Sequence, residues 1–249
     1  MVSYHIILYQ LILFPVPLVA GDYSPIVNQL KPNTITIIGE THKHPVSITL
    51  FQSLIYEYLK QHKCLTIGLE IASNQQTKID QIKQGRAAVS DIKIPSMIDH
   101  PPYRMMISNL VKLQKQNSCL KLIAIDAGDD INLGRDVWMA IKLAEQIGKT
   151  PVLVLLGNLH SLKKVDWDLS MTKGSPYVAE ILVSQGYTVR SYPQIWANDQ
   201  CKIKNQFISE DDSKLPTLLN NSFISLLNAF DFKNTEGVVD GAIFWDCTF

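Results

Sequence analysis

Short apolar runs alternate with longer amphipathic stretches along most of the chain. Between the runs, apolar residues recur at intervals of three and four, which is typical of helices that pack through one face. The runs have the length and composition of buried strands and cover residues 34–39, 65–70, 120–126, 151–157 and 187–192. This alternation predicts an α/β fold with three layers, in which helices cover both faces of a mostly parallel central sheet.

Three helices stand out in the pattern. One begins with Pro45, a residue suited to the first turn of a helix, and runs to about residue 62. The others cover residues 103–117 and 133–148. The stretch 75–102 is less regular and ends in two adjacent prolines, which predicts a loop over one edge of the sheet.

The N-terminus has the order of a secretory signal. Residues 6–14 are apolar and are followed by prolines and small residues up to residue 21. No lysine or arginine precedes the apolar stretch, which leaves a buried first strand as the alternative. We therefore expect a signal peptide over residues 1–21, a single α/β domain over residues 22–249, and a secreted or periplasmic location.

Composition and charge describe an ordinary globular protein. The 249 residues are 46% hydrophobic and contain 23 Lys plus Arg against 23 Asp plus Glu, so the formal net charge is zero. A neutral chain has no overall electrostatic attraction to nucleic acid, so nucleic-acid binding is not expected. No run after the N-terminus reaches the roughly 18 apolar residues of a membrane span, so we expect no integral membrane anchor.

The four cysteines contain no Cys-x-x-Cys pair, which argues against a structural zinc cluster. Cys64 and Cys119 each precede an apolar strand and could be neighbours at one end of the sheet. In an exported protein, disulfides Cys64–Cys119 and Cys201–Cys247 are conceivable. Four cysteines allow three pairings, and buried free thiols are the alternative.

Polar residues follow the apolar runs where four of the predicted strands end. Because the carboxyl ends of parallel strands meet at one edge, where ligands bind in open α/β sheets, we expect these residues to lie together. Gly39 and Gly157 each precede a histidine by three positions, and glycine allows a sharp turn and close approach of a substrate. Strand by strand, the polar residues are Glu40 with His42, Glu70, Asp126, and Asn158 with His160.

Two imidazoles and two carboxylates at one edge suggest a metal site. Imidazole nitrogen and carboxylate oxygen suit Mn²⁺, Co²⁺ or Zn²⁺, and the predicted ligands are His42, His160, Glu40 and Glu70. A metal-bound water is acidic enough to attack a substrate at neutral pH. In a metal-free alternative, a histidine oriented by a carboxylate acts as general base on water, and an arginine stabilises the oxyanion.

The ordered motifs resemble those of a known superfamily. The chain contains GETH at residues 39–42, GLE ending at Glu70, GRDVWMA with Arg135, and GNLH at residues 157–160. This set resembles the haem-binding-uptake, Tiki, TraB and erythromycin-esterase superfamily, whose members share two Gly-x-x-His motifs, an acidic residue after the second strand and an arginine that opens a later helix. The resemblance covers about residues 33–192. In its size and its export-like N-terminus, the chain resembles the ChaN-like branch of this superfamily most.

The resemblance implies that one pocket brings together His42, Glu70, Arg135 and His160, with Glu40 beside them. In that pocket Arg135 would be an anion or oxyanion clamp, a role that suits a planar guanidinium. From the residues alone, Arg135 is also readily explained as a surface helix residue that pairs with Asp136 or Glu145.

Two functions follow as hypotheses. The first is an exported, metal-assisted hydrolase of ester or amide bonds in a small-molecule or peptide substrate, with catalytic residues His42, His160, Glu70, Arg135 and Glu40. The alternative is a haem or iron uptake protein of the ChaN type without turnover, in which a histidine or Tyr103 binds the iron. A third reading is a scaffold that keeps the polar cluster without activity. The oligomeric state is not predicted.

Overall fold

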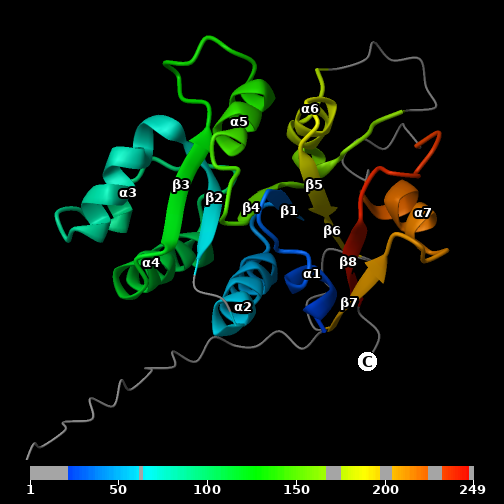
Figure 1. Ribbon diagram of the computed structural model, residues 1–249, viewed down its shortest axis with the longest axis horizontal. Coiled ribbons are helices and arrows are strands. Elements are labelled where there is room, and N and C mark those ends of the chain that lie inside the picture. Colours follow the sequence, from blue (N-terminus) through cyan, green and yellow to red (C-terminus); the bar gives the residue numbers. More distant parts are fainter. Residues whose placement is uncertain (1–21, 62–63, 167–174, 197–203, 224–231, 247–249) are drawn as a thin grey trace, which may run out of the picture.

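The computed structural model of the chain describes residues 22–61, 64–166, 175–196, 204–223 and 232–246. Its main sheet has five strands in the order β3-β2-β4-β1-β5, and every neighbouring pair is parallel (Figure 1). The predicted α/β class with a parallel central sheet is confirmed. The strands are β1 (Thr34–Glu40), β2 (Leu65–Ala72), β3 (Leu120–Asp126), β4 (Val152–Gly157) and β5 (Thr188–Tyr192).

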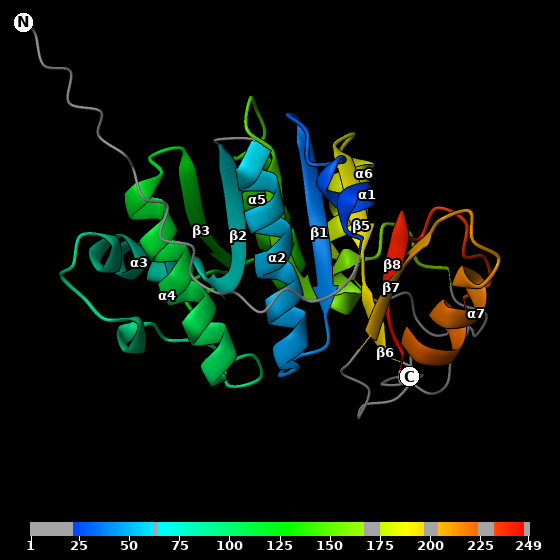
Figure 2. The same ribbon diagram turned by 90° about the horizontal axis from the view of Figure 1, so that it is seen from below.

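Helices cover both faces of this sheet, as the apolar periodicity predicts. α2 (Pro45–Gln61) and α4 (Pro101–Gln116) lie on one face, and α5 (Arg135–Ala144) and α6 (Val178–Ser184) lie on the other (Figure 2). Each face has its own apolar cluster, and these two clusters supply the burial that stabilises the three layers. The short helix α1 (Ser24–Val27) joins the first cluster.

The stretch predicted as a loop contains more helix than expected. It holds α3 (Gln76–Lys83) and two short 3₁₀ turns, η1 (Ser73–Gln75) and η2 (Val89–Asp91). Its two final prolines do not interrupt a helix, because they occupy the first turn of α4, where a backbone N–H has no intrahelical partner. Arg104 on α4 fastens the segment by donating to the Val89 carbonyl at 2.8 Å and to the Asp99 carboxylate at 2.7 Å.

A second, three-stranded sheet extends the fold beyond β5. Its order is β6-β8-β7, with β6 and β8 parallel and β7 and β8 antiparallel. The buried side chain of Gln194 connects it to the main sheet, because Nε2 donates to the Gly39 carbonyl at 3.0 Å while Oε1 accepts from Trp245 Nε1 at 3.2 Å. Its strands are β6 (Gln194–Trp196), β7 (Lys204–Ser209) and β8 (Gly241–Asp246). The chain between β7 and β8 contains α7 (Leu215–Leu218) and the π turn η4 (Leu219–Phe223), and the short turn η3 (Asn158–Ser161) follows β4 in the main sheet.

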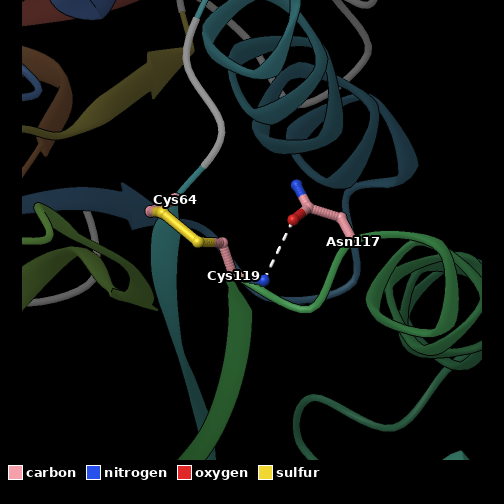
Figure 3. Close-up of a disulfide and its surroundings, with 3 residues drawn as sticks. All are labelled: Cys64, Asn117 and Cys119. Carbon is pink, nitrogen blue, oxygen red and sulfur yellow. Dashed lines mark hydrogen bonds between the residues drawn. A yellow bond between two sulfur atoms is a disulfide. The ribbon is translucent and has the colours of Figure 1, made fainter.

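A disulfide joins Cys64 to Cys119 at the amino ends of β2 and β3 (Figure 3). The strands pair directly beyond it, Leu65 with Leu120, so the bridge lies at the first rung of the ladder. The backbone N–H of Cys119 also donates to Asn117 Oδ1 at 3.0 Å. One of the pairings that the sequence left open is thus present, and the other pair, Cys201 and Cys247, lies outside the described residues.

The predicted signal peptide, residues 1–21, also lies outside the described residues. Within the described part of the chain, no helix combines the length and the apolar character that crossing a membrane requires. The proposed export of the protein therefore stays a prediction.

Candidate functional site

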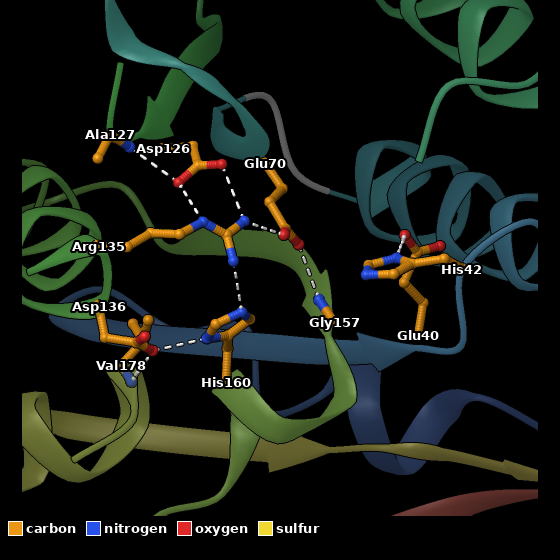
Figure 4. A network of polar contacts seen from close by, with 10 residues as sticks. All are labelled: Glu40, His42, Glu70, Asp126, Ala127, Arg135, Asp136, Gly157, His160 and Val178. Carbon is orange, nitrogen blue, oxygen red and sulfur yellow. Dashed lines mark hydrogen bonds and ion pairs between the residues drawn. The ribbon is translucent and has the colours of Figure 1, made fainter. Parts of the chain in front are cut away.

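The candidate site lies along the carboxyl-terminal edge of the main sheet (Figure 4). β1 ends at Glu40, β3 ends at Asp126 and β4 ends at Gly157, while Glu70 lies near the end of β2. Because all four strands run the same way, their ends meet at one edge. The order β3-β2-β4-β1 places β4 centrally, so residues that are far apart in the sequence become neighbours.

His42 is oriented by Glu40. The His42 Nδ1 atom lies 3.1 Å from Glu40 Oε1, and the side chains are 25% and 2% exposed, respectively. A carboxylate accepts hydrogen bonds, so Nδ1 carries the proton that it shares with Glu40, and the lone pair of the neutral ring is then on Nε2. Among the described residues, no hydrogen bond reaches that Nε2 atom. His42 therefore presents a directed and unshared ligand atom at the edge of the sheet.

Burial and charge act in opposite directions on this pair. Burial lowers the pKa of His42, but the hydrogen bond and charge of Glu40, with the charge of Glu70, outweigh it, and the net pKa is raised above 6.5. Burial raises the pKa of Glu40, against the opposing effect of His42. The dyad therefore holds its proton more firmly than an exposed histidine does.

His160 is held between an anion and a cation. Its Nδ1 lies 2.6 Å from Asp136 Oδ1, and its Nε2 lies 3.0 Å from Arg135 Nη1. A guanidinium can only donate, so Nε2 of His160 accepts and the ring proton is on Nδ1. Both nitrogens of His160 therefore have partners, in contrast to those of His42.

Arg135 is the centre of the network in Figure 4. Nε and Nη2 donate to the two oxygens of Asp126 at 2.8 and 2.9 Å, in the fork geometry that guanidinium and carboxylate share. Nη2 also donates to Glu70. Burial lowers the pKa of Arg135, but the two carboxylates outweigh it and the net pKa is raised, so the side chain stays charged. One N–H of Nη1 has no partner among the described residues.

Glu70 links the network to the end of β4. Its Oε2 accepts from the Gly157 backbone N–H at 2.8 Å while Oε1 accepts from Arg135. Both oxygens of this buried carboxylate are therefore engaged by the protein itself. The structure thus places Glu70 as a residue that positions Arg135 and the GNLH segment.

The two motif glycines are needed for space. A Cβ at Gly157 would lie 3.2 Å from His42 Cε1, and a Cβ at Gly39 would lie 2.4 Å from Asn158 Oδ1. Neither glycine has a positive φ, so the sharp turn expected at these positions is not their role. The turn after β1 is instead made by Lys43, whose φ of 66° is unusual for a side chain with a Cβ.

Asn158 locks the second motif in place. Its amide Nδ2 donates to the Gln194 carbonyl at 2.8 Å and its Oδ1 accepts from the Gln194 N–H at 3.1 Å. This pair of bonds joins the end of β4 to the start of β6, directly over Gly39. The GNLH segment therefore has a fixed geometry against the second sheet.

Tyr103 lies in the interior beneath the edge. Its side chain is 1% exposed, and burial together with the charges of Glu40, Glu70 and Asp126 raises its pKa well above 10.0. No hydrogen bond from the described residues reaches the Tyr103 hydroxyl or the Glu40 Oε2 atom. The phenolate that would bind iron is therefore strongly disfavoured at this position.

The structure brings the predicted site residues to one edge but divides them into two groups. Glu40 and His42 form a dyad, while Glu70, Arg135 and His160 form a network with Asp126 and Asp136. The described residues contain no group of three or more His, Cys, Asp or Glu side chains arranged to hold a metal ion. The physical reason is that Arg135 occupies the ligand atoms of both Glu70 and His160.

Asp136 is the site residue that the sequence reasoning did not assign. The sequence suggests it only as a surface partner of Arg135, but it binds His160 and also accepts from the Val178 N–H at 3.0 Å at the start of α6. Its position in the first turn of α5 could have indicated a role in the site, because this end of the helix lies at the same edge of the sheet. Adjacent residues at such a turn both reach the same edge.

Comparison with known proteins finds no matching family model and no matching curated protein. Among solved structures, that of ChaN of Campylobacter jejuni, described as showing cofacial haem binding, is 13% identical with a TM-score of 0.49, over 73% of this chain and 89% of that chain. The C-terminal region of Pasteurella multocida toxin, described as having a thiol-protease-like catalytic triad, is 10% identical with a TM-score of 0.41, over 65% of this chain and 22% of that chain. At these identities and TM-scores, neither similarity assigns an activity to this chain.

Proposed function

We propose that the protein binds haem at the carboxyl-terminal edge of its main sheet, where His42 would hold the iron. The observation that carries the proposal is the His42–Glu40 dyad. Histidines that bind metals commonly donate their second ring N–H to a carboxylate, which fixes the tautomer and strengthens the ligand. His42 has this arrangement, with Nδ1 on Glu40 and Nε2 beside Gly157, in a side chain that is 25% exposed.

The donor set fits haem better than it fits a free divalent metal. A protein site for Zn²⁺ needs three or four side-chain ligands, whereas haem iron already has its porphyrin nitrogens and needs one axial residue. Glu70 and His160 have their ligand atoms on Arg135, which leaves His42 as the available imidazole of the pair. When bound, haem would supply iron for transport or for redox chemistry, and the chain's part is to hold it.

Two cations at the same edge suit the propionates of haem. Lys43 follows the proposed ligand directly, is exposed, and has a left-handed backbone conformation. Arg135 is 44% exposed and has one N–H to spare on Nη1. Charge-assisted bonds from such groups to carboxylates are stronger than neutral hydrogen bonds.

The sequence resemblance supports the same reading, since the superfamily includes a haem-uptake branch. We propose that the chain belongs to this superfamily and that it is exported to the periplasm or secreted. The disulfide between Cys64 and Cys119 supports export, because such bonds persist in oxidising compartments. Haem binding is described for ChaN of Campylobacter jejuni. The proposal for this chain stands on its own residues.

Titration with haemin tests the proposal. The wild-type protein is expected to develop a Soret band at one equivalent, and His42→Ala is expected to lose it. His160→Ala is the matched control, because its Nε2 atom is held by Arg135 and is not offered to a ligand. Equal spectra for the wild type and His42→Ala, with both proteins folded by circular dichroism, would refute ligation by His42.

Hydrolysis of an ester or amide bond is the second candidate function. It is favoured by one observation, that both edge histidines have a carboxylate partner, Glu40 and Asp136, as a general base does. In this case His42 would take a proton from water, and Arg135 would face the developing oxyanion. Turnover of a small ester such as p-nitrophenyl acetate that disappears in His42→Ala would support it, and turnover unchanged in that variant would exclude it.

A further inference from the structure

A second candidate binding site lies at the opposite edge of the main sheet. An open cavity of about 470 Å³ is formed there by α1, the end of α2 and the segments that enter β1, β2 and β4. Cavities of this size are typical of small-molecule sites, which span roughly 300–1,000 Å³. The cavity shares no residue with the candidate haem site, and it does not depend on the proposed function.

The lining combines an apolar wall with two cations. Val27, Leu30 and Pro151 contribute apolar surface, and Lys31 and Lys149 contribute the charges. The side chains of Lys31 and Lys149 form no ion pair or hydrogen bond with another described residue, although the Lys31 carbonyl accepts from the Thr34 N–H at 3.3 Å. The described lining contains no aspartate or glutamate, so the positive charge of the two lysines is not balanced within the cavity.

Backbone hydrogen bonds hold the two lysines on neighbouring segments. The Asn33 N–H donates to the Gly148 carbonyl at 2.9 Å, which ties the turn after Lys31 to the loop before Lys149. Asn33 has a φ of 59°, so this turn has a defined and unusual conformation. The Thr66 N–H donates to the Pro151 carbonyl at 3.1 Å and fixes the other side of the same loop. The fold therefore holds the backbone segments that carry the two lysines next to each other.

From this arrangement we infer that the cavity binds a small organic anion with an apolar body, such as an aromatic or short aliphatic monocarboxylate. The ammonium groups of Lys31 and Lys149 would hold the anionic group, since lysine acts as a compact point charge for anions. The apolar wall would cover the body of the ligand. This division of polar and apolar contacts is the usual one in small-molecule sites.

One residue of the cavity wall is part of the disulfide. Cys64 lines the cavity and is bonded to Cys119, so the wall is covalently held to the start of β3. Reduction frees this wall from its neighbour strand. We expect the oxidised protein to bind the anion more tightly than the reduced protein.

The test uses the fluorescent anion 8-anilinonaphthalene-1-sulfonate and its neutral analogue N-phenyl-1-naphthylamine. The double variant Lys31→Gln with Lys149→Gln is compared with Lys93→Gln with Lys115→Gln, which removes the same charge from exposed lysines outside the cavity. We expect the cavity variant to bind the anion about tenfold more weakly, equivalent to about 1.4 kcal/mol. The control variant should bind it as the wild type does, and the neutral analogue should not distinguish the proteins.

The outcomes separate this site from the haem site and from general dye binding. Anion binding that persists in His42→Ala but weakens in the cavity variant supports the inference. Equal weakening in the cavity and control variants, or no saturable binding by the wild type, overturns it. Near-ultraviolet circular dichroism of every variant shows that the comparison is made between folded proteins.

Discussion

The imidazole of His42 lies directly against Gly157, so that a Cβ at Gly157 would meet His42 Cε1 at 3.2 Å and Nε2 at 3.3 Å. His160 Cδ2 would lie 3.6 Å from the same Cβ. The glycine of the second motif therefore provides the space that the histidine of the first motif fills. Each Gly-x-x-His unit is completed by the other.

We predict that Gly157→Ala displaces the His42 ring and weakens haemin binding about tenfold, since the ring must give way by a few tenths of an ångström. The melting temperature should change little, because the ring is partly exposed and can move outward. Absorbance titration and thermal unfolding measure the two effects. Gly148→Ala, at a glycine with no atom within 4 Å of the added Cβ, is the control. Unchanged haemin affinity in Gly157→Ala would contradict the packing argument.

Gly39→Ala should act on stability instead. The new Cβ would lie 2.4 Å from Asn158 Oδ1 and 3.0 Å from the Pro193 backbone, which cannot move without shifting β6. We expect a loss of about 2–3 kcal/mol in the free energy of unfolding, the usual cost of overpacking a rigid site. Urea denaturation measures it. A variant as stable as the wild type would show that the junction between the two sheets is softer than these contacts indicate.

Haem affinity should fall as the pH is lowered. A protonated His42 has no lone pair on Nε2, and its pKa is raised above 6.5, so ligation should be lost at a higher pH than for an ordinary histidine. Glu40→Gln removes the charge that raises this pKa, and the midpoint of the profile should then move to lower pH. Haemin titrations in a series of buffers test both statements. If the midpoint does not move in Glu40→Gln, the pH dependence of haemin binding does not arise from the His42–Glu40 pair.

Removal of the Arg135 guanidinium should destabilise the protein. Arg135→Gln leaves Glu70 and Asp126, each 5% exposed, without their shared counter-ion. Unpairing buried charges costs about 3–5 kcal/mol, and because Arg135 is 44% exposed we expect about 2 kcal/mol. The deficit should shrink in acid, where carboxylates are neutralised.

Chemical unfolding at neutral and acidic pH measures this deficit. The control is Arg86→Gln, at an exposed arginine whose side chain bonds only Gln84 among the described residues. Asp126→Asn added to Arg135→Gln should restore part of the stability, because it removes one of the two unpaired charges. A double variant less stable than the single one would argue against charge repulsion as the cause.

The disulfide should contribute about 4 kcal/mol to stability under oxidising conditions, the value expected from loop closure over a separation of 55 residues. The double variant Cys64→Ser with Cys119→Ser should lose this contribution and become insensitive to dithiothreitol. Guanidinium unfolding with and without the reductant checks both. The wild type and the variant should converge when both are reduced.

Much of the fold follows from local pattern. The strand runs at residues 34–39 and 151–157 predict β1 and β4 closely, because buried parallel strands are continuously apolar. Since the strands are parallel, the polar residues after them had to reach one edge. That reasoning places His42 and His160 at the same edge of the sheet, and the pairing of β1 with β4 then makes them neighbours.

The pairing of side chains within the site could not be predicted in the same way. Arg135, the first residue of α5, pairs with Asp126 at the end of β3, and the partner of His160 is Asp136, which stands beside Arg135 in the sequence. Such choices depend on strand order and on rotamers, which no local pattern encodes. The bonds of Gln194 to Gly39 and Asn158 are likewise long-range, and the short strand β6 has too few residues to show a period.

The register of β1 against β4 aligns Glu40 with Gly157, and the pair is separated by well over a hundred positions in the chain. Shifting one strand by a single residue would turn Glu40 to the opposite face and take the histidine away from its glycine. A misaligned chain would thus be compact and helical yet unable to bind its ligand. Haemin binding is therefore a readout of the correct register between β1 and β4, a pairing of residues that are far apart in the chain.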